Sequence, residues 1–458
     1  MLDTNLQTAV AISDYAIIVD EADDVAVVKN ETSENPALLL PNGKTVMVKQ
    51  AVPLGHRFAT RVIAAGDFVC QYGQPIGTSL GIEAGEWVTH ENMSDDVPVV
   101  RDLPEDLHTP APDYFEAEEI ETFMGFRRPD GRIGTRNFIL IVPTSMCVSH
   151  EASQISMMSE FLHYKRETYP NVDGVVAIPH NKGCGCQDGS NLDIMLRTLS
   201  NYAAHPNVGG VVLMDLGCEK TNLAKVEKYL LKRELSFNKP VAKIGIQEIG
   251  GTQAAIERGL KIVEEMLPQV NQATREEFPV SELVLGVKCG SSDGFSGISA
   301  NPALGRAADI LVRSNGTVLI TEVPEFCGAE HILANRAKNA ETGRAIYQMI
   351  DCFKDYASKF GGNLNNNPSP GNIASGLLNI TIKSLGALAK SAVIKLSSNN
   401  RIFEKMKRDI DVSAGNIIEG TETIEDVGKR LFEHIRRVAS GDVLAKAEEN
   451  KHRVRRYV

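Results

Sequence analysis

Apolar runs in the middle of the chain end in polar, glycine-rich clusters that contain cysteine. Four runs have this form: Phe138–Thr144, Gly174–Pro179, Gly209–Leu216 and Leu283–Lys288. A short and nearly continuous apolar run is typical of a strand that is buried on both faces of a parallel sheet. We therefore predict four buried parallel strands, and a fifth strand at Val318–Val323.

Segments with helical spacing separate these strands. Apolar residues recur every three or four positions in Ser149–Glu160, Gly189–Ala204, Leu223–Glu234 and Thr252–Val270. Strands that alternate with helices indicate a parallel α/β domain, which we place at residues 121–391. The chain from Asn400 has a helical, charged pattern. We assign residues 392–458 to the C-terminal part of the same region.

The N-terminal part follows a different pattern, with short β-type runs separated by turn residues such as Asn42-Gly43. These runs are Val25–Val28, Thr45–Val52, Arg57–Val62, Asp67–Tyr72 and Glu86–His90. We predict a small, mainly β domain at residues 14–93. Residues 94–120 contain four prolines and many acids without apolar periodicity, which is typical of an extended linker. The predicted fold class is α/β with a small N-terminal all-β domain, a parallel-sheet core and a helical C-terminal tail.

Composition narrows the classes of function. The net charge of -11 over 458 residues argues against a nucleic-acid surface, which needs clustered Lys and Arg. No apolar stretch reaches membrane-spanning length, and the first residues lack the basic segment of a signal peptide. Eight cysteines in so long a chain are typical of reduced thiols, so we expect a cytoplasmic protein.

The candidate chemistry follows the predicted strands. In open α/β sheets, ligands bind beyond the carboxyl ends of the strands, and cysteines or a histidine stand at those positions. We therefore expect His180, Cys184, Cys218 and Cys289 to meet at one crevice. The His180–Cys186 cluster is either a metal site or a tight glycine turn, because a Cys-x-Cys pair alone is weak support for a metal. Cys218 alone fits a buried, apolar thiol as well as a site residue.

The stretch from Cys289 to Pro302 combines hydroxyls and glycines in a way that a core does not need. It predicts a loop and helix start that hold an anion such as a carboxylate. The polar segment from Asn365 to Asn372 is either a substrate loop or a connector with several turns. No phosphate-binding or dinucleotide-binding glycine motif is present, which argues against an ATPase or an NAD enzyme.

Taken together, these motifs resemble the altronate and galactarate dehydratases along nearly the whole chain. The β domain is similar to the family's SAF (β-clip) domain at Pro53-Leu-Gly-His56-Arg-Phe-Ala59, Tyr72-Gly-Gln-Pro-Ile-Gly77 and Gly85-Glu-Trp-Val88. The remainder is similar at Gly131–Asn137, His180 with Gly183-Cys184, Leu216–Lys220, Lys288–Asp293 through Asn301-Pro302, and Asn367–Asn372. Thr321–Glu325 with Gly328-Ala-Glu330 is closer to the altronate branch.

The chain departs from the family pattern at two places. Thr89-His90-Glu91-Asn92 stands where altronate-type members often have alternating histidines. After Ser391 the family continues through a long stretch with a Thr-Gly-Arg-Gly motif, whereas this chain passes directly to Ala392. We therefore predict that a family segment is missing here, either from the sequence as given or by true deletion.

The resemblance implies a hydro-lyase that converts a sugar acid of the altronate or galactarate type into a 2-keto-3-deoxy acid. A base takes the α proton, a general acid protonates the departing β-hydroxyl, and a divalent metal stabilises the enolate-like intermediate. Fe²⁺ is the expected metal, with Mn²⁺ or Mg²⁺ as alternatives. The implied catalytic residues are His180, Lys288 and Asp293; the substrate contacts are Ser291, Ser292, Asn301 and Asn372; the metal ligands are His56, Glu91, Cys184, Cys218 and Cys289.

Three alternatives stay open at this point. The same fold can eliminate sulfite from sulfolactate, the cysteines can hold an iron–sulfur cluster, and the chain can bind a sugar acid without turnover. The expected partner is a small-molecule sugar acid, and not nucleic acid or a membrane. We expect a homo-oligomer, in the form of a dimer.

Overall fold

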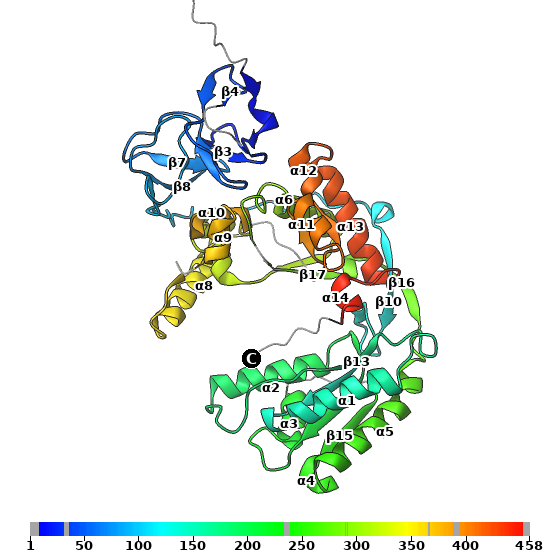
Figure 1. Cartoon of the computed structure of the whole chain (residues 1–458). Coiled ribbons are helices and arrows are strands. Elements are labelled where there is room, and N and C mark those ends of the chain that lie inside the picture. The colour runs from blue at the N-terminus through cyan, green and yellow to red at the C-terminus, as the bar shows by residue number, and fades with distance from the viewer. Residues whose placement is uncertain are drawn as a thin grey trace, which may run out of the picture. The chain divides into compact units, whose positions relative to one another are not determined.

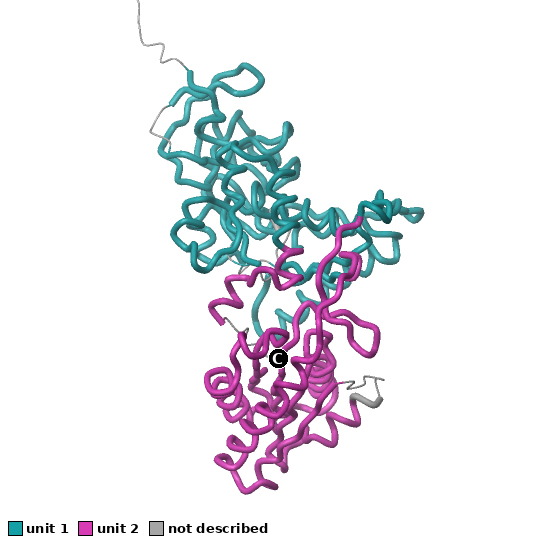
Figure 2. Tube along the Cα trace, turned by 90° about the vertical axis from the view of Figure 1, so that its right-hand side faces the viewer, with its two compact units in different colours: residues 1–119, 283–434 teal, residues 120–282, 435–458 magenta. Residues whose placement is uncertain are grey.

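The computed structural model describes residues 9–31, 36–232, 239–288, 290, 292–364, 367–387 and 394–451. The chain divides into two compact units, each built from two separate segments (Figure 2). Unit 1 comprises residues 1–119 and 283–434, and unit 2 comprises residues 120–282 and 435–458. The boundary at residues 282/283 falls inside the region that we predicted as a single α/β domain, 121–391.

The N-terminal part of unit 1 is rich in short strands, as the sequence predicts. Its sheets have the orders β1-β4-β5, β2-β3-β6 and β7-β8-β9. The elements are β1 (Val10–Ala11), η1 (Ile12–Asp14), β2 (Ala16–Ile17), β3 (Val25–Val28), β4 (Ala37–Leu39), β5 (Thr45–Met47), β6 (Arg57–Ala59), β7 (Phe68–Gln71), β8 (Gln74–Ser79) and β9 (Met93–Ser94). The predicted strand at Glu86–His90 does not form, because its pairing is limited to one bridge between Trp87 and Phe58.

The second segment of unit 1 is mainly helical. Its strands form two parallel pairs, β17 (Val284–Val287) with β18 (Thr317–Ile320) and β19 (Leu396–Ser397) with β20 (Val412–Ser413). The helices are α6 (Ala300–Arg313), η5 (Val323–Phe326), α7 (Glu330–Asn335), α8 (Ala340–Ser358), α9 (Pro370–Ala374), α10 (Ile380–Ala387), α11 (Asn400–Lys405), α12 (Gly415–Glu419) and α13 (Ile424–Ser440), which continues into unit 2.

The proline-rich segment 94–120 is largely extended, with one short helix, η2 (Ala117–Glu119). Side chains hold it against the helical second segment of unit 1. Arg101 donates to buried Glu330 and to Asp351, and the Thr109 hydroxyl donates to the carbonyl of Ala337. The segment is therefore packed along α7 and α8 and does not extend freely into solvent.

Unit 2 is built on a parallel sheet of order β13-β12-β14-β15. Its strands are β12 (Phe138–Pro143), β13 (Gly174–Ala177), β14 (Val208–Asp215) and β15 (Val241–Gly245). Helices α1 (Ser149–Leu162) and α5 (Thr252–Val270) cover one face, and α2 (Ser190–Ala203) with α3 (Leu223–Lys232) covers the other (Figure 1). Side chains of β12 alternate between the two faces of the sheet: Ile139 and Ile141 pack on one face, and Leu140 and Val142 on the other. Both faces are therefore apolar, and helices cover both.

A smaller antiparallel sheet, β11-β10-β16, completes unit 2. Its strands are β10 (Thr122–Arg127), β11 (Ile133–Gly134) and β16 (Arg275–Pro279), and the remaining helices are η3 (Met146–Val148), α4 (Ile246–Ile249), η4 (Val280–Glu282) and α14 (Lys446–Glu449). The C-terminal segment returns to this unit through a two-pronged pair between the Arg136 guanidinium and the Glu448 carboxylate, with N–O distances of 2.6 and 2.8 Å. Among the described residues, no helix is long and apolar enough to span a membrane.

The predicted parallel core is therefore confirmed only in part. Three of the four predicted strands, β12, β13 and β14, lie side by side in one sheet. The fourth, Leu283–Lys288, forms β17 in unit 1 and pairs with β18. The expectation of one sheet carrying all four clusters is wrong, because the local apolar pattern predicts a strand but not its partner.

Candidate active site

In unit 2, the loops that follow β12 and β14 are joined by the carboxylate of Glu219. This buried group accepts hydrogen bonds from the Thr144 hydroxyl at 2.8 Å and from the backbone N–H groups of Leu216 at 2.8 Å and Gly217 at 2.7 Å. Burial alone would raise the pKa of Glu219, but these donors outweigh it and hold the pKa below its usual value. The anion therefore organises the carboxyl edge of the sheet.

The loop after β13 is tied to the same edge. Lys220 donates to the carbonyl of Cys186 at 2.9 Å and lies 3.2 Å from the Asp188 carboxylate. The Thr221 hydroxyl donates to the carbonyl of Thr144. The loops that follow the three neighbouring strands β12, β13 and β14 thus meet, as expected for the carboxyl ends of parallel strands.

His180 is buried at this edge, and both of its ring nitrogens have partners. Nε2 lies 3.0 Å from the carbonyl oxygen of Pro143, so Nε2 carries the proton. Nδ1 accepts the backbone N–H of Lys182 at 3.2 Å. Burial lowers the pKa of His180, and the nearby Lys182 charge adds to this effect. The ring is therefore neutral near pH 7 and anchors its own loop to the end of β12.

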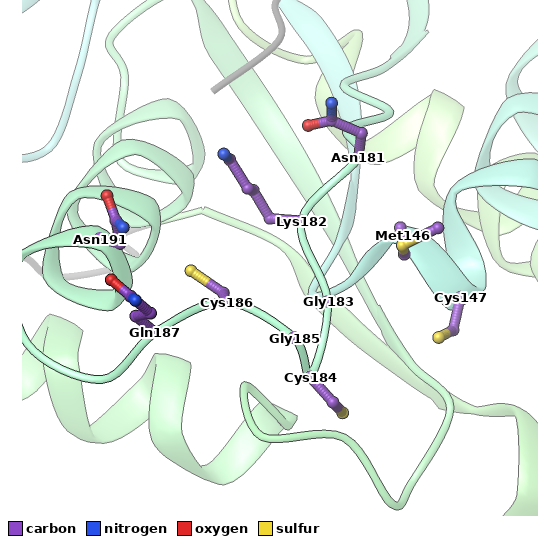
Figure 3. A pocket seen from close by; sticks show the side chains of 10 residues that line it. All are labelled: Met146, Cys147, Asn181, Lys182, Gly183, Cys184, Gly185, Cys186, Gln187 and Asn191. Atoms are coloured by element: carbon purple, nitrogen blue, oxygen red, sulfur yellow. The ribbon is translucent and has the colours of Figure 1, made fainter. Parts of the chain in front are cut away.

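A pocket of about 340 Å³ opens between the segments that follow β12 and β13 (Figure 3). It includes Cys184 from the predicted site, and its wall also contains two cysteines and several amides that the sequence had not assigned. The lining residues are Met146, Cys147, Asn181, Lys182, Gly183, Cys184, Gly185, Cys186, Gln187 and Asn191. Figure 3 shows Cys184 and Cys186 pointing in different directions.

In unit 1, three motif loops meet at glycines. An added Cβ at Gly294 or at Gly376 would lie 2.1 Å from the carbonyl oxygen of Gly55. The N–H of Gly294 donates to the carbonyl of Ser375 at 2.8 Å. No side chain fits at this junction, which explains the glycines at positions 55, 294 and 376. The junction brings the β domain onto two loops of the helical segment.

His56 and Arg57 extend from the β domain to the turn after α9. His56 Nε2 lies 3.2 Å from the carbonyl of Ala374, so this nitrogen carries the proton and Nδ1 keeps its lone pair. His56 Nδ1 is buried and has no hydrogen-bond partner among the described residues. Burial lowers the pKa of His56, and the charge of Arg57 adds to this effect.

Arg57 is fully buried, and one of its terminal nitrogens donates to the carbonyl of Gly376 at 2.7 Å. Its Nε and Nη1 have no partner within the described part of the chain. Burial lowers the pKa of Arg57 to about 10, so the guanidinium stays charged at neutral pH. Arg57 was not in the predicted site. The available signal was a charged residue inside an apolar strand run.

The predicted residues Ser292 and Asp293 lie in the loop before α6, and Asn372 lies in helix α9, which precedes the turn at Gly376. The amide of Asn372 donates to the carbonyl of Ser292 at 2.7 Å, and its oxygen accepts from Ser369 at the start of α9. The Asp293 carboxylate accepts from Ser398 at 2.6 Å and from the Ser296 hydroxyl at 3.0 Å. Asp293 therefore orders the loop in front of α6 through hydrogen bonds from uncharged hydroxyl groups.

The other predicted residues are more scattered. Lys288 is exposed, with its ammonium 3.9 Å from a Glu322 oxygen, and Asn301 lies in the first turn of α6. Glu91 and Cys218 are exposed, while Cys289 and Ser291 lie outside the described residues. Within the described ranges, no group of three or more His, Cys, Asp or Glu side chains is placed to hold a metal ion.

Comparisons with known proteins cover all of these regions. Family models match at residues 14–96 (altronate/galactarate dehydratase SAF domain), 125–271 (D-galactarate dehydratase/altronate hydrolase, second domain), and 280–393 with 391–456 (D-galactarate/altronate dehydratase, C-terminal). Altronate dehydratase of Bacillus subtilis (strain 168) is 35% identical over 369 residues, covering 80% of this chain and 71% of the relative. The chain belongs to the altronate/galactarate dehydratase family. It is thus a member of a family of hydro-lyases.

Two further relatives extend the comparison. Galactarate dehydratase (L-threo-forming) of Escherichia coli (strain K12) is 31% identical over 498 positions, with 93% of each chain covered. The beta subunit of (2R)-sulfolactate sulfo-lyase of Chromohalobacter salexigens (strain ATCC BAA-138) is 26% identical over 382 residues, covering 70% of this chain and 93% of the relative.

The comparisons also bear on the departure after Ser391. The C-terminal family model matches in two pieces that meet at residues 391–393. The alignment with the galactarate dehydratase spans more positions than the 458 residues of this chain. Residues 388–393 lie outside the described residues, so the predicted break between Ser391 and Ala392 stays a prediction.

Proposed function

We propose that this protein dehydrates a sugar acid of the altronate or galactarate type to a 2-keto-3-deoxy acid. The observation that carries the proposal is the family match over all three regions of the chain, which includes both loop clusters described above. The resemblance of Thr321–Glu325 and Gly328–Glu330 favours an aldonate of the altronate type. The reaction removes the proton at C2 and the hydroxyl at C3, and the resulting enol becomes the keto acid.

His180 stays our proposed proton-transfer group, and the hydrogen bonds around it define what it must do. Its low pKa keeps it neutral, which is the form that a base requires. Nδ1 accepts the Lys182 N–H, so that bond has to be exchanged for the substrate proton. We propose Lys288 and Asp293 as polar groups that assist the proton transfer. Asp293 also orders its own loop. Ser291, Ser292, Asn301 and Asn372 stay proposed substrate contacts.

The proposed metal has less support from the residues in place. Of the donors that we expected, His56 has a buried Nδ1 lone pair without a partner among the described residues, which suits a ligand. Glu91, Cys184 and Cys218 belong to no set of three donors in the described part of the chain, and Cys289 lies outside that part. The described residues do not fit a preassembled site, and we assign no step to the metal. Metal analysis of the purified protein tests this part of the proposal.

A second candidate function is elimination of sulfite from a sulfolactate-type substrate. It is favoured by the match to the sulfo-lyase beta subunit, which covers 70% of this chain. Both reactions remove the proton at C2, and they differ in the group that leaves C3, which is a hydroxyl in the dehydration and sulfite in the second candidate.

A substrate screen separates these functions. The purified chain is incubated with aldonates, aldarates and sulfolactate, with Fe²⁺ and a thiol present, and 2-keto acid and sulfite are both measured. We expect 2-keto acid from an aldonate or aldarate without sulfite. Sulfite from sulfolactate supports the second candidate. Sugar-acid binding without any product means a non-catalytic binding protein.

A further inference from the structure

The pocket in unit 2 carries a cation that no group in the described part of the chain neutralises. The ammonium of Lys182 has no ion-pair or hydrogen-bond partner among the residues that the structure describes. The acids closest along these loops are already engaged, because Asp188 pairs with Lys220 and Glu219 accepts from backbone and hydroxyl donors. The pocket is therefore suited to an anionic group from a ligand.

Amide side chains complete the polar part of the wall. Figure 3 shows Lys182 extending toward the side of the pocket where Gln187, Asn191 and Cys186 lie. The amides of Asn181, Gln187 and Asn191 have no side-chain partner in the described structure. Each amide offers donors and an acceptor, as hydroxyl groups do, so the wall suits a ligand with several hydroxyls. Met146 and Cys147 form the less polar side.

We propose that this pocket binds the sugar acid, with Lys182 holding its carboxylate and with Gln187 and Asn191 bonding its hydroxyl groups. The volume of about 340 Å³ falls within the range of small-molecule sites, about 300–1,000 Å³. This inference rests on the proposed function and adds residues to it that the motifs had not singled out. It places substrate recognition beside His180, whose Nδ1 accepts the N–H of Lys182 itself.

The test uses a ligand that binds but cannot react. A six-carbon 3-deoxy aldonate has no β-hydroxyl to lose, and the matching 3-deoxy alditol lacks the carboxylate. Titration calorimetry on the full chain compares the wild type, Lys182→Gln, Asn191→Ala and Lys225→Gln. Lys225→Gln is the matched control, because it removes the same charge from an exposed position on α3 of the same unit.

We expect Lys182→Gln to weaken aldonate binding by about tenfold or more, the usual effect of losing a hydrogen bond to a charged group. Its binding of the alditol should not change. Asn191→Ala should weaken both ligands by about two- to tenfold, and Lys225→Gln should change neither. The melting temperature of Lys182→Gln should equal that of the wild type, because the ammonium has no partner to lose among the described residues.

Several results would overturn the inference: a wild type that binds neither ligand, a Lys182→Gln variant that keeps the wild-type preference for the acid, or an equal loss in Lys225→Gln. A separate turnover assay keeps the two proposals distinguishable. If the wild type releases keto acid while Lys182→Gln binds normally, the function stands and this pocket assignment fails. If Lys182 controls binding but the wild type shows no turnover, the pocket assignment stands and the proposed dehydration function fails.

Discussion

At the scale of single residues, the two candidate histidines differ in which nitrogen is available. His180 uses Nε2 and Nδ1 for the Pro143 carbonyl and the Lys182 N–H, whereas His56 leaves Nδ1 unpartnered among the described residues. His180 is thus part of the loop structure as well as a candidate base. A substitution at His180 therefore has to separate these two roles.

His180→Gln is suited to that purpose, because the Gln amide can donate to the Pro143 carbonyl and accept from the Lys182 N–H. We expect kcat to fall by about 10²–10⁴, the usual range for general acid–base catalysis, with a small change in Tm. Burial lowers the pKa of His180 from 6.5, so the active neutral form should persist below pH 6.5. Wild-type kcat/KM should accordingly decline on the acid side only below that pH. Full activity of the Gln variant would exclude His180 as the base.

Glu219 allows a stability prediction with a defined pH dependence. Glu219→Gln should lower the free energy of unfolding by about 2–3 kcal/mol at pH 7, because charged hydrogen bonds to two backbone N–H groups are lost. The folded-state pKa lies below its ordinary value of 4.5, so this contribution is present above pH 4.5 and is lost as the pH falls through the folded-state pKa. Denaturant titrations of both proteins at several pH values measure the difference. A constant difference down to the lowest pH would contradict the assignment.

At the scale of elements, the glycine junction of unit 1 makes a sharp prediction. Gly376→Ala places a Cβ 2.1 Å from the Gly55 carbonyl at a residue with φ of +98°. We expect the free energy of unfolding to fall by more than about 2 kcal/mol, because the backbone is strained and the Gly55 loop is displaced. The Tm should fall accordingly. Gly371→Ala is the control, because no atom lies within 4 Å of its added Cβ and it stands in helix α9. We expect Gly371→Ala to raise the free energy of unfolding by about 0.5–1 kcal/mol. Equal effects of the two substitutions would show that the loops are not in close contact.

The sequence predicted whether a segment forms a helix or a strand where the spacing of its apolar residues is regular. Thr252–Val270 was predicted and is observed as α5 with the same bounds. Partner choice was not predictable in this way: the Leu283–Lys288 run is a strand but pairs in another unit. Arg57 and Gly376 were missed because their importance depends on a close approach between segments more than 300 residues apart in sequence. The stretches that contain Asp293 and Asn372 were singled out by their polar, glycine-containing sequences, and the resemblance added weight to His56. Local pattern alone says nothing about their meeting.

At the scale of the whole molecule, both units are assembled from distant parts of the chain. In unit 2 the connection is the Arg136–Glu448 pair, in which Arg136 is buried. We expect Glu448→Gln to lower the stability of the chain by about 1–3 kcal/mol, because the guanidinium loses its charged partner in a partly exposed pair. Glu449→Gln is the control, since its pair with Lys446 is exposed. Thermal unfolding compares them, and an unchanged Tm for Glu448→Gln would show that the pair does not hold the segment.

The proposed reaction removes the C2 proton and the C3 hydroxyl of a sugar acid. The most direct measurement is the reaction with altronate in D₂O, with the product followed by NMR. We expect a 2-keto-3-deoxy acid that carries one solvent deuterium at C3, because the enol is protonated there. If altronate and galactarate both yield no 2-keto acid, with Fe²⁺ and a thiol present, the proposal is contradicted.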